Sequence, residues 1–204
     1  MLTHSSIVKN RAAGILVSRM DEESGTGSHA DIKSTLVRDT TGDASGSFGR
    51  GIEITLGATA TIEDSAIVGN NETSIVVGSA GSSATVRRSI VRDTKMRADL
   101  FGHGVIADSE STLVLEESWL LRHPGVALAV VSSGATLARS LVAQSGVGVH
   151  VQGAAKLEVV QTVPTPPAPG AVSISEDTRF VENATRVGSG EIPLPSIMGV
   201  DAQR

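Results

Sequence analysis

Short runs of apolar and β-branched residues recur along the chain, and Gly, Asn and Ser separate them. The runs fall into three kinds that follow one another in a fixed order, and each has the length of a short strand. Examples of the three kinds, in order along the chain, are "EDSAIVGN", "SIVV" and "GSSATV". The pattern therefore predicts three short strands in each repeating unit.

The length of the repeat is measured from a Ser or Thr that opens the first run of each unit. Aligned in this way, the anchors are Ser6, Thr35, Ser65, Ser89, Ser118, Ser140 and Thr162. Successive anchors are 29, 30, 24, 29, 22 and 22 residues apart. A minimum of 22 residues with occasional additions is typical of a fixed coil that carries loop insertions.

Three short strands cannot bury a face by themselves, but stacked coils pair strand on strand and enclose a shared apolar column. We therefore predict an all-β fold, a parallel β-solenoid of six or seven coils with 22 to 30 residues each. A leucine-rich repeat is the alternative at this period, but its dense leucine pattern and its Asn or Cys position are missing.

The frame of each strand decides which side chains enter the column. The residues predicted to point inward are Ile7, Leu36, Ile67, Ile90, Trp119 and Leu141. Their neighbours one residue along are the alternative, because a shift of one residue exchanges the two faces of a strand. The anchor Ser and Thr side chains are predicted to stack at one corner, where their hydroxyl groups bond to the backbone.

Composition agrees with many short, tightly turned strands and argues against several classes of protein. The 204 residues include 22 Gly but only 3 Phe, 1 Trp and no Tyr. Without cysteine the chain forms neither a disulfide nor a thiolate metal site. A net charge of −5 argues against nucleic acid or an anionic membrane surface as the partner. No apolar run reaches the roughly 18 residues of a transmembrane helix, and "MLTHSSIVKN" lacks the features of a signal peptide.

The two ends of the repeat region differ from its middle. The proline-rich segment 164–170 cannot continue a ladder of backbone hydrogen bonds, so the coils are predicted to occupy residues 1–163. Residues 171–204 are predicted to form an irregular C-terminal coil or cap with a loose tail from Asp201. At the other end no cap precedes the first repeat, which predicts a longer exported precursor or self-association through the N-terminal coil.

Three phrases carry a resemblance to a known family: "GATATIEDSAIVGN", "GSSATVRRSIVRDT" and "ESTLVLEESWLLRH". They resemble the right-handed parallel β-helix repeat family, which has the fold of pectin lyase-like proteins. The resemblance covers about residues 4–163 and implies a single-stranded, right-handed parallel β-helix. It says little about activity, since one fold hosts many functions. The chain is also similar to uncharacterised β-helix proteins of high-GC bacteria such as myxobacteria.

Two coils are enlarged at the same corner by loops of similar sequence. Both loops open with Arg-Asp-Thr, at Arg38 and Arg92, and both close with Phe-Gly-X-Gly directly before a strand. His103 therefore takes the place that Arg50 has in the other loop, and the glycines meet a need for positive φ or close backbone approach. Polygalacturonase-type hydrolases carry a similar Gly-His-Gly, but the acidic and basic motifs of their neighbouring coils are missing here. We interpret His103 as a corner residue, with a catalytic role as the alternative.

Carboxylates and basic side chains gather at the start of these loops. Asp39 and Asp93 hold equivalent places two coils apart, roughly 10 Å by the strand spacing, which approaches the carboxylate separation of an inverting glycosidase. The same oxygens could bind Ca²⁺, or shape each loop as an Asx turn, which is the interpretation we favour. The catalytic candidates are Asp39, Asp93 and His103. The candidates for ligand binding are Arg38, Asp39, Asp43, Arg50, Arg92, Asp93, Asp99 and His103.

Three functions stay open at this point. The first is a non-catalytic structural or binding module of an exported bacterial protein, which recognises surface carbohydrate through the loops at 40–50 and 94–103. The second is a polysaccharide lyase or glycoside hydrolase that uses the catalytic candidates. The third is a spacer or assembly strut. A polysaccharide is accordingly the expected partner, and no cofactor is expected apart from the alternative of Ca²⁺.

Overall fold

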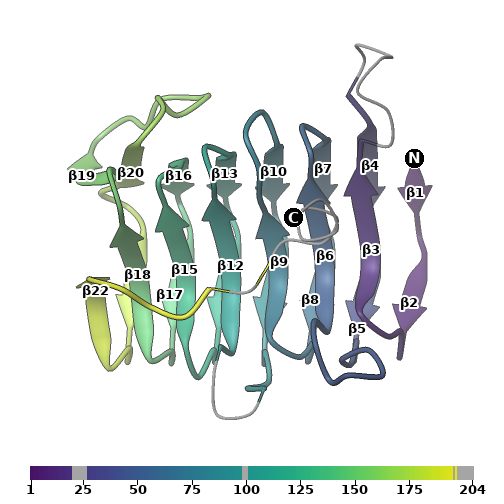
Figure 1. Cartoon of the computed structure of the whole chain (residues 1–204). Coiled ribbons are helices and arrows are strands. Elements are labelled where there is room, and N and C mark those ends of the chain that lie inside the picture. Colours follow the sequence, from purple (N-terminus) through teal and green to yellow (C-terminus); the bar gives the residue numbers. More distant parts are fainter. Residues whose placement is uncertain (20–26, 98–100, 195, 197–204) are drawn as a thin grey trace.

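The computed structural model describes residues 1–19, 27–97, 101–194 and 196. Three parallel sheets run along the length of the molecule, and each turn of the chain adds one strand to each sheet in the same order (Figure 1). No helix occurs in the described residues, so none there is long and apolar enough to cross a membrane. The prediction of an all-β parallel solenoid is confirmed, and the second and third sheets each have seven strands, one for each coil.

The strands are named here by sheet. The first sheet contains, in spatial order, β1 (Leu2–Thr3), β4 (His29–Lys33), β7 (Thr59–Glu63), β10 (Ser83–Arg87), β13 (Thr112–Glu116), β16 (Gly134–Ala138), β20 (Ala171–Ser175) and β19 (Lys156–Val160). The second sheet contains β2 (Ser6–Val8), β5 (Leu36–Arg38), β8 (Ala66–Val68), β11 (Ile90–Arg92), β14 (Trp119–Leu121), β17 (Leu141–Ala143) and β21 (Arg179–Val181). The third sheet contains β3 (Ala13–Ser18), β6 (Arg50–Thr55), β9 (Thr73–Val77), β12 (His103–Asp108), β15 (Val126–Val131), β18 (Val147–Gln152) and β22 (Thr185–Ser189).

The apolar column lies between the three sheets and is filled by alternate side chains of each strand. In the second sheet the inward row is Ile7, Val37, Ile67, Val91, Leu120, Val142 and Phe180. The predicted frame is therefore right at Ile7 and Ile67. It is wrong at Leu36, Ile90, Trp119 and Leu141, whose neighbours one residue along enter the column instead.

The frame error has a simple cause in the first repeat. Ser6 pairs with Leu36, so the residue opposite Thr35 is Ser5 and not Ser6. Trp119 was expected to fill the column, but it points outward and is 50% exposed. The correction matters for function, because it places the one indole of the chain on the surface.

The stacked Ser and Thr side chains form a hydroxyl ladder at the corner between the first and second sheets. The Ser65 hydroxyl accepts a hydrogen bond from the backbone N–H of Thr35 at 3.1 Å and donates one to the carbonyl of Glu63 at 2.7 Å. The same pair of bonds recurs at Ser89, Ser118 and Ser140. This confirms the predicted stack, which gives the buried amide at the corner an acceptor in the next coil.

Two further columns of corner residues have the left-handed backbone conformation. One column, with φ between 47° and 51°, contains His4, Ser34, Asp64, Arg88, Glu117 and Arg139. The other, with φ between 53° and 65°, contains Lys9, Asp39, Gly69, Asp93, Arg122, Gln144 and Glu182. We expected Gly, Asn and Ser at such corners, but most of these side chains are charged, and several of them pair with opposite charges in other coils. Asp64 with Arg88 at 2.8 Å is one example.

The last coil follows an excursion of the chain. β19 lies at the outer edge of the first sheet, and β20 then inserts between β16 and β19, so the proline-rich segment 164–170 spans this excursion. Leu141 pairs with Arg179, which places Thr178 next to Ser140. The prediction that Thr162 continues the ladder is therefore wrong. β20, β21 and β22 form a full coil in register with the one before, although an irregular one was expected. The tail predicted from Asp201 lies outside the described residues.

We expect Ser118→Ala to lower the free energy of unfolding by about 1–3 kcal/mol, since it leaves the buried N–H of Ser89 without its acceptor. Urea unfolding followed by circular dichroism measures the change. Ser118→Thr is the matched control, because Thr35 makes the equivalent bond to the carbonyl of Lys33. Equal losses in the two variants would show that the hydroxyl is not what stabilises the corner.

Candidate functional site

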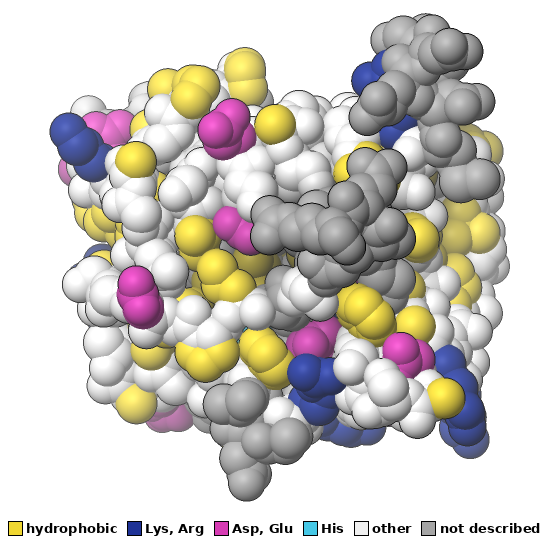
Figure 2. Space-filling view, viewed as in Figure 1, with side chains coloured by type: hydrophobic (Ala, Val, Ile, Leu, Met, Phe, Trp, Pro, Cys, Tyr) yellow, Lys and Arg dark blue, Asp and Glu magenta, His cyan; other side chains and the backbone are white. Residues whose placement is uncertain are grey.

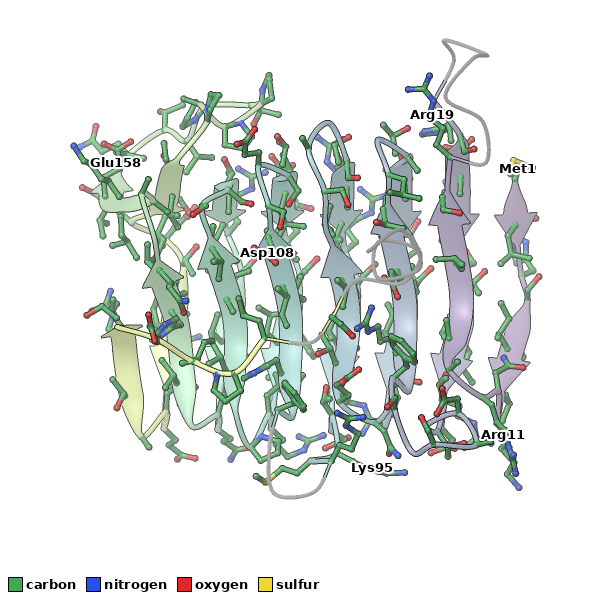
Figure 3. All side chains as sticks on the ribbon, in the orientation of Figure 1. Met1, Arg11, Arg19, Lys95, Asp108 and Glu158 are labelled. Carbon is green, nitrogen blue, oxygen red and sulfur yellow. The ribbon has the colours of Figure 1, made fainter. Side chains whose placement is uncertain are left out.

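The two sister loops lie against each other at one end of the strands of the third sheet. A guanidinium nitrogen of Arg97 donates to the carbonyl of Gly46 at 3.0 Å, which joins the second loop to the first. In each loop the phenylalanine covers an arginine: Phe48 lies 4.9 Å from the guanidinium of Arg50, and Phe101 lies 5.2 Å from that of Arg97. Figure 2 shows Lys and Arg side chains gathered along this lower edge, and Figure 3 labels Lys95 and Arg11 there.

The glycines of the two Phe-Gly-X-Gly motifs have the two roles that the sequence predicted. Gly49 and Gly102 have positive φ, at 104° and 79°. At Gly51 a Cβ atom would lie 2.5 Å from the carbonyl oxygen of Ser74, and at Gly104 it would lie 2.5 Å from that of Ala127. The first glycine of each motif therefore turns the loop, and the second lets the strand approach the next coil.

Asp39 and Asp93 lie at the surface in the left-handed corner column, and both are held by basic side chains. Asp39 contacts Lys95 at 3.3 Å and Arg38 at 3.7 Å. Arg122 binds Asp93 through two nitrogens, at 2.6 and 3.0 Å, and Arg92 contacts it as well. The hydrogen bond from Arg122 is the main reason why the pKa of Asp93 lies below its usual value. Both carboxylates are thus engaged in cross-coil ion pairs.

Asp43 shapes the first loop from within. One of its carboxylate oxygens accepts bonds from the Ser45 hydroxyl at 2.6 Å and from the backbone N–H groups of Ser45 and Ser47 at 2.8 and 2.9 Å. The Ser45 hydroxyl is the main cause of the lowered pKa of Asp43. Asp99 lies outside the described residues, and among those that are described no group of three or more His, Asp or Glu side chains is placed to hold a metal ion.

Arg50 is fully buried at the start of β6, inside a cluster of charges that the sequence did not predict. It contacts Glu53 at 2.6 Å and Glu72 at 3.3 Å, and Arg97 approaches Glu72 from the second loop at 3.6 Å. Glu53 and Glu72 are also buried. Two positive and two negative side chains balance, as buried charges require. The equivalence of Arg50 and His103 was the one available signal, and the strand register confirms it.

His103 opens β12, is 4% exposed, and uses both ring nitrogens. Its Nδ1 accepts the backbone N–H of Val126 at 3.0 Å, and its Nε2 lies 3.3 Å from the carbonyl oxygen of Pro193. Burial lowers the pKa of His103. The segment that carries Pro193, residues 190–194 and 196, follows β22 and runs across β18, β15 and β12 (Figure 1); we call it the strap.

The strap lies over the outer face of the third sheet. Ile192 packs against Ile106, Val126, Ala129 and Val147. Because the strap crosses the strands, it is held by side chains and not by strand pairing. The Ile192 N–H donates a hydrogen bond to the side chain of Gln152 at 3.1 Å. His150 lies 2.9 Å from the Gly190 carbonyl oxygen, and Arg50 donates to the Ser196 carbonyl. His150 points outward from its strand, as predicted, and is covered by the strap.

His123 takes a place in a third corner column, which is polar and buried. Its Nδ1 lies 3.0 Å from the Thr94 hydroxyl and its Nε2 lies 3.2 Å from the carbonyl of Val91. Two coils further along this column, Asn183 makes the equivalent bond to the carbonyl of Val142 at 2.9 Å. Burial lowers the pKa of His123 to about 4. His123 is therefore a neutral structural residue.

Six of the eight predicted site residues thus fall into two groups. Arg38, Asp39, Arg92 and Asp93 form a surface ladder of ion pairs, whereas Arg50 and His103 are buried beneath the strap. His103 bonds to Val126 and Pro193, and Asp93 bonds to Arg92 and Arg122, so the three catalytic candidates share no hydrogen bond with one another in the described structure.

Sequence reasoning missed a surface feature around Trp119. A shallow pocket of about 220 Å³ lies beside the indole and is lined by Arg88, Ser89, Ile90, Glu117 and Trp119. The signal that could have found it is the register of Ser5 with Thr35, which turns Trp119 outward.

The three parallel sheets and the hydrogen-bonded corners between them define the class of protein, which is a parallel β-helix. The chain matches the family described as the right handed beta helix region over residues 1–162, and it belongs to that family. No curated protein and no solved structure matches it.

His123 makes stability depend on pH. Its pKa is about 4 in the folded protein and about 6.5 in an unfolded chain, so the unfolded state binds more protons between these values. Stability is therefore complete above pH ~6.5 and falls by up to about 3 kcal/mol as the pH drops towards 4. We expect His123→Asn, which copies Asn183, to flatten this dependence in urea unfolding between pH 7 and 4.5. A variant as sensitive to pH as the parent would assign the dependence to another group.

Proposed function

We propose that this protein is a non-catalytic binding module that recognises carbohydrate through the outer face of the second sheet. The observation that carries the proposal is Trp119, which is half exposed on that face beside a shallow pocket. The resemblance of this chain to bacterial β-helix proteins supports a place in an exported bacterial protein.

The outer face of the second sheet is apolar along its middle. The first outward row is Ser6, Leu36, Ala66, Ile90, Trp119, Leu141 and Arg179. Trp119 therefore lies between Ile90 and Leu141 in adjacent coils, with Leu121 two residues further along its own strand. These side chains give the indole a firm apolar support, because neighbouring strands are only about 4.8 Å apart.

Charged side chains hold the rim of the pocket in place. Arg88 is bound to Asp64 at 2.8 Å, and Glu117 is bound to Arg139 at 3.2 Å. Both residues belong to the left-handed corner column, which fixes their backbone. A donor and an acceptor are thus preorganised beside the indole, at the corner that precedes β11 and β14, which lowers the entropy that binding would otherwise cost.

This combination suits a sugar ring better than an ion or a purely apolar molecule. A pyranose ring has a C–H face, which packs on an indole, and a rim of hydroxyl groups, which need donors and acceptors. Arg88 and Glu117 supply both. The pocket is open along the sheet, so an extended polysaccharide could continue over Ile90 and Leu141 into adjacent coils.

The enzyme alternative is weaker on the same geometry. Asp93 is neutralised by Arg92 and Arg122, and His103 is 4% exposed with both ring nitrogens occupied. A general acid or base needs access to the substrate proton. The favoured function is therefore recognition without cleavage.

We expect binding of a recognised polysaccharide to change the fluorescence of Trp119, which reports alone because the chain has 1 Trp and no Tyr. The screen uses neutral and acidic polysaccharides, with and without Ca²⁺. Calorimetry on Trp119→Ala should then show a loss of affinity of about tenfold or more, as expected for a central aromatic contact, and Trp119→Phe should lose less.

Leu36→Ala is the matched control, because Leu36 lies in the same outward row three strands away and should leave affinity unchanged. Release of reducing or unsaturated ends from any polysaccharide would contradict a non-catalytic role. No response to any of them would contradict carbohydrate recognition and favour self-association through β1, β2 and β3, which are edge strands of the described sheets. Sedimentation would test that outcome.

A further inference from the structure

We propose that the strap is a pH-dependent latch, closed over the third sheet while His103 is neutral and opened when His103 takes up a second proton. The latch uncovers the apolar patch of Ile106, Val126, Ala129 and Val147 together with Arg50. This inference concerns the third sheet, whereas Trp119 lies on the second sheet, and it does not depend on carbohydrate binding.

The hydrogen bonds of His103 fix its protonation state. The backbone N–H of Val126 can only donate, so Nδ1 of His103 must be the acceptor and carries no proton. The carbonyl of Pro193 can only accept, so Nε2 must carry the proton and donate. One neutral tautomer satisfies both partners. A proton on Nδ1 would point at another donor only 3.0 Å away.

The surroundings of His103 also disfavour its charged form while the strap is closed. The ring is almost fully buried, and burial is the main cause of its lowered pKa. The titratable groups that face it are His150 on β18, which lowers the pKa further, and His123 behind it. On the other side, Arg50 pairs with Glu53 and Glu72 and leaves no free carboxylate of that cluster to stabilise an imidazolium.

The strap is built so that the loss of one anchor can release it. It has no strand partner among the described residues, and its polar contacts are the four single bonds from Gln152, His150, His103 and Arg50. Along the strap, the bond from His103 to Pro193 lies between the bond to Gly190 at one end and the bond to Ser196 at the other. Gly190, at the start of the strap, has φ of 106° and no atom within 4 Å of where a Cβ would lie, so it can serve as a hinge.

The direction of the pH effect follows from linkage. Once the strap leaves, the His103 ring meets water and regains an ordinary affinity for protons, so the open form binds more protons than the closed form. Below pH ~6.5 the ratio of open to closed strap should therefore rise about tenfold per pH unit, until the pH reaches the lowered pKa of the closed form.

Methyl NMR of isoleucine in the full chain tests the latch between pH 7.5 and 5. The Ile192 methyl signal should move towards its solvent-exposed position as the pH falls, while the methyl signal of Ile75, which is fully buried in the column, stays in place. His103→Gln keeps a donor for Pro193 but cannot titrate, so its Ile192 signal should not respond. His150→Gln is the matched control, because it keeps a donor for Gly190 and should still respond to pH.

Three results would overturn the proposal. An Ile192 signal that stays closed down to pH 5 in the parent would show that no latch opens. Movement of Ile192 and Ile75 together would show global unfolding in its place. An unchanged response in His103→Gln, or its loss in His150→Gln alone, would assign the pH dependence to a residue other than His103.

Discussion

The structure depends on the need of every corner amide for an acceptor in the next coil. At the hydroxyl ladder, one serine accepts the N–H of the preceding coil and donates to its own chain two residues back, as Ser118 does for Ser89 and Glu116. These bonds hold only when consecutive coils are in the same register. Insertions can therefore vary in length but not in place. The longest interval in the ladder, from Ser140 to Thr178, still places Thr178 next to Ser140, and the Thr178 hydroxyl donates to the carbonyl of Leu137 in the preceding coil at 3.3 Å.

The same constraint explains why the conspicuous carboxylates are structural. The left-handed columns are fixed by the register, and a charged residue placed there comes next to the corner residue of an adjacent coil. Asp93 with Arg122 and Asp64 with Arg88 are such pairs. A carboxylate in an ion pair of this kind is a poor general base or metal ligand, because its pKa is lowered and its oxygens are occupied. The binding role that we propose therefore uses the outward rows of the strands, whose side chains do not form the corner bonds.

The regular part of the fold could be predicted because its information is local and repeated. Ser65, Ser89, Ser118 and Ser140 each follow a charged residue and precede a short apolar run, and they make the same bonds in space. The inward frame of the later coils was lost because the repeat was aligned on Ser6, although the residue opposite Thr35 is Ser5. In sequence, Ser5 and Ser6 fit the pattern equally well. Thr162 was mistaken for an anchor because it follows Ser140 by the same 22 residues that separate Ser140 from Ser118. The prolines after it span an excursion between β19 and β20 and do not end the repeats. The buried cluster of Arg50 and Glu72 was out of reach, because it joins residues of different loops.

The outward rows of a solenoid expose side chains to solvent unless something covers them. The strap and Trp119 illustrate the two cases. On β12, β15 and β18 of the third sheet the outward residues include Ile106 and His103, and a crossing segment of the same chain covers them. A crossing segment cannot pair with the strands, so its backbone N–H and C=O groups are bound by side chains. Each of these side chains comes from the strand that the segment crosses at that point. The outward row of the second sheet offers an aromatic surface beside fixed charges. This surface presents side chains and no free backbone edge, so the partner that we propose for it is a saccharide and not another strand.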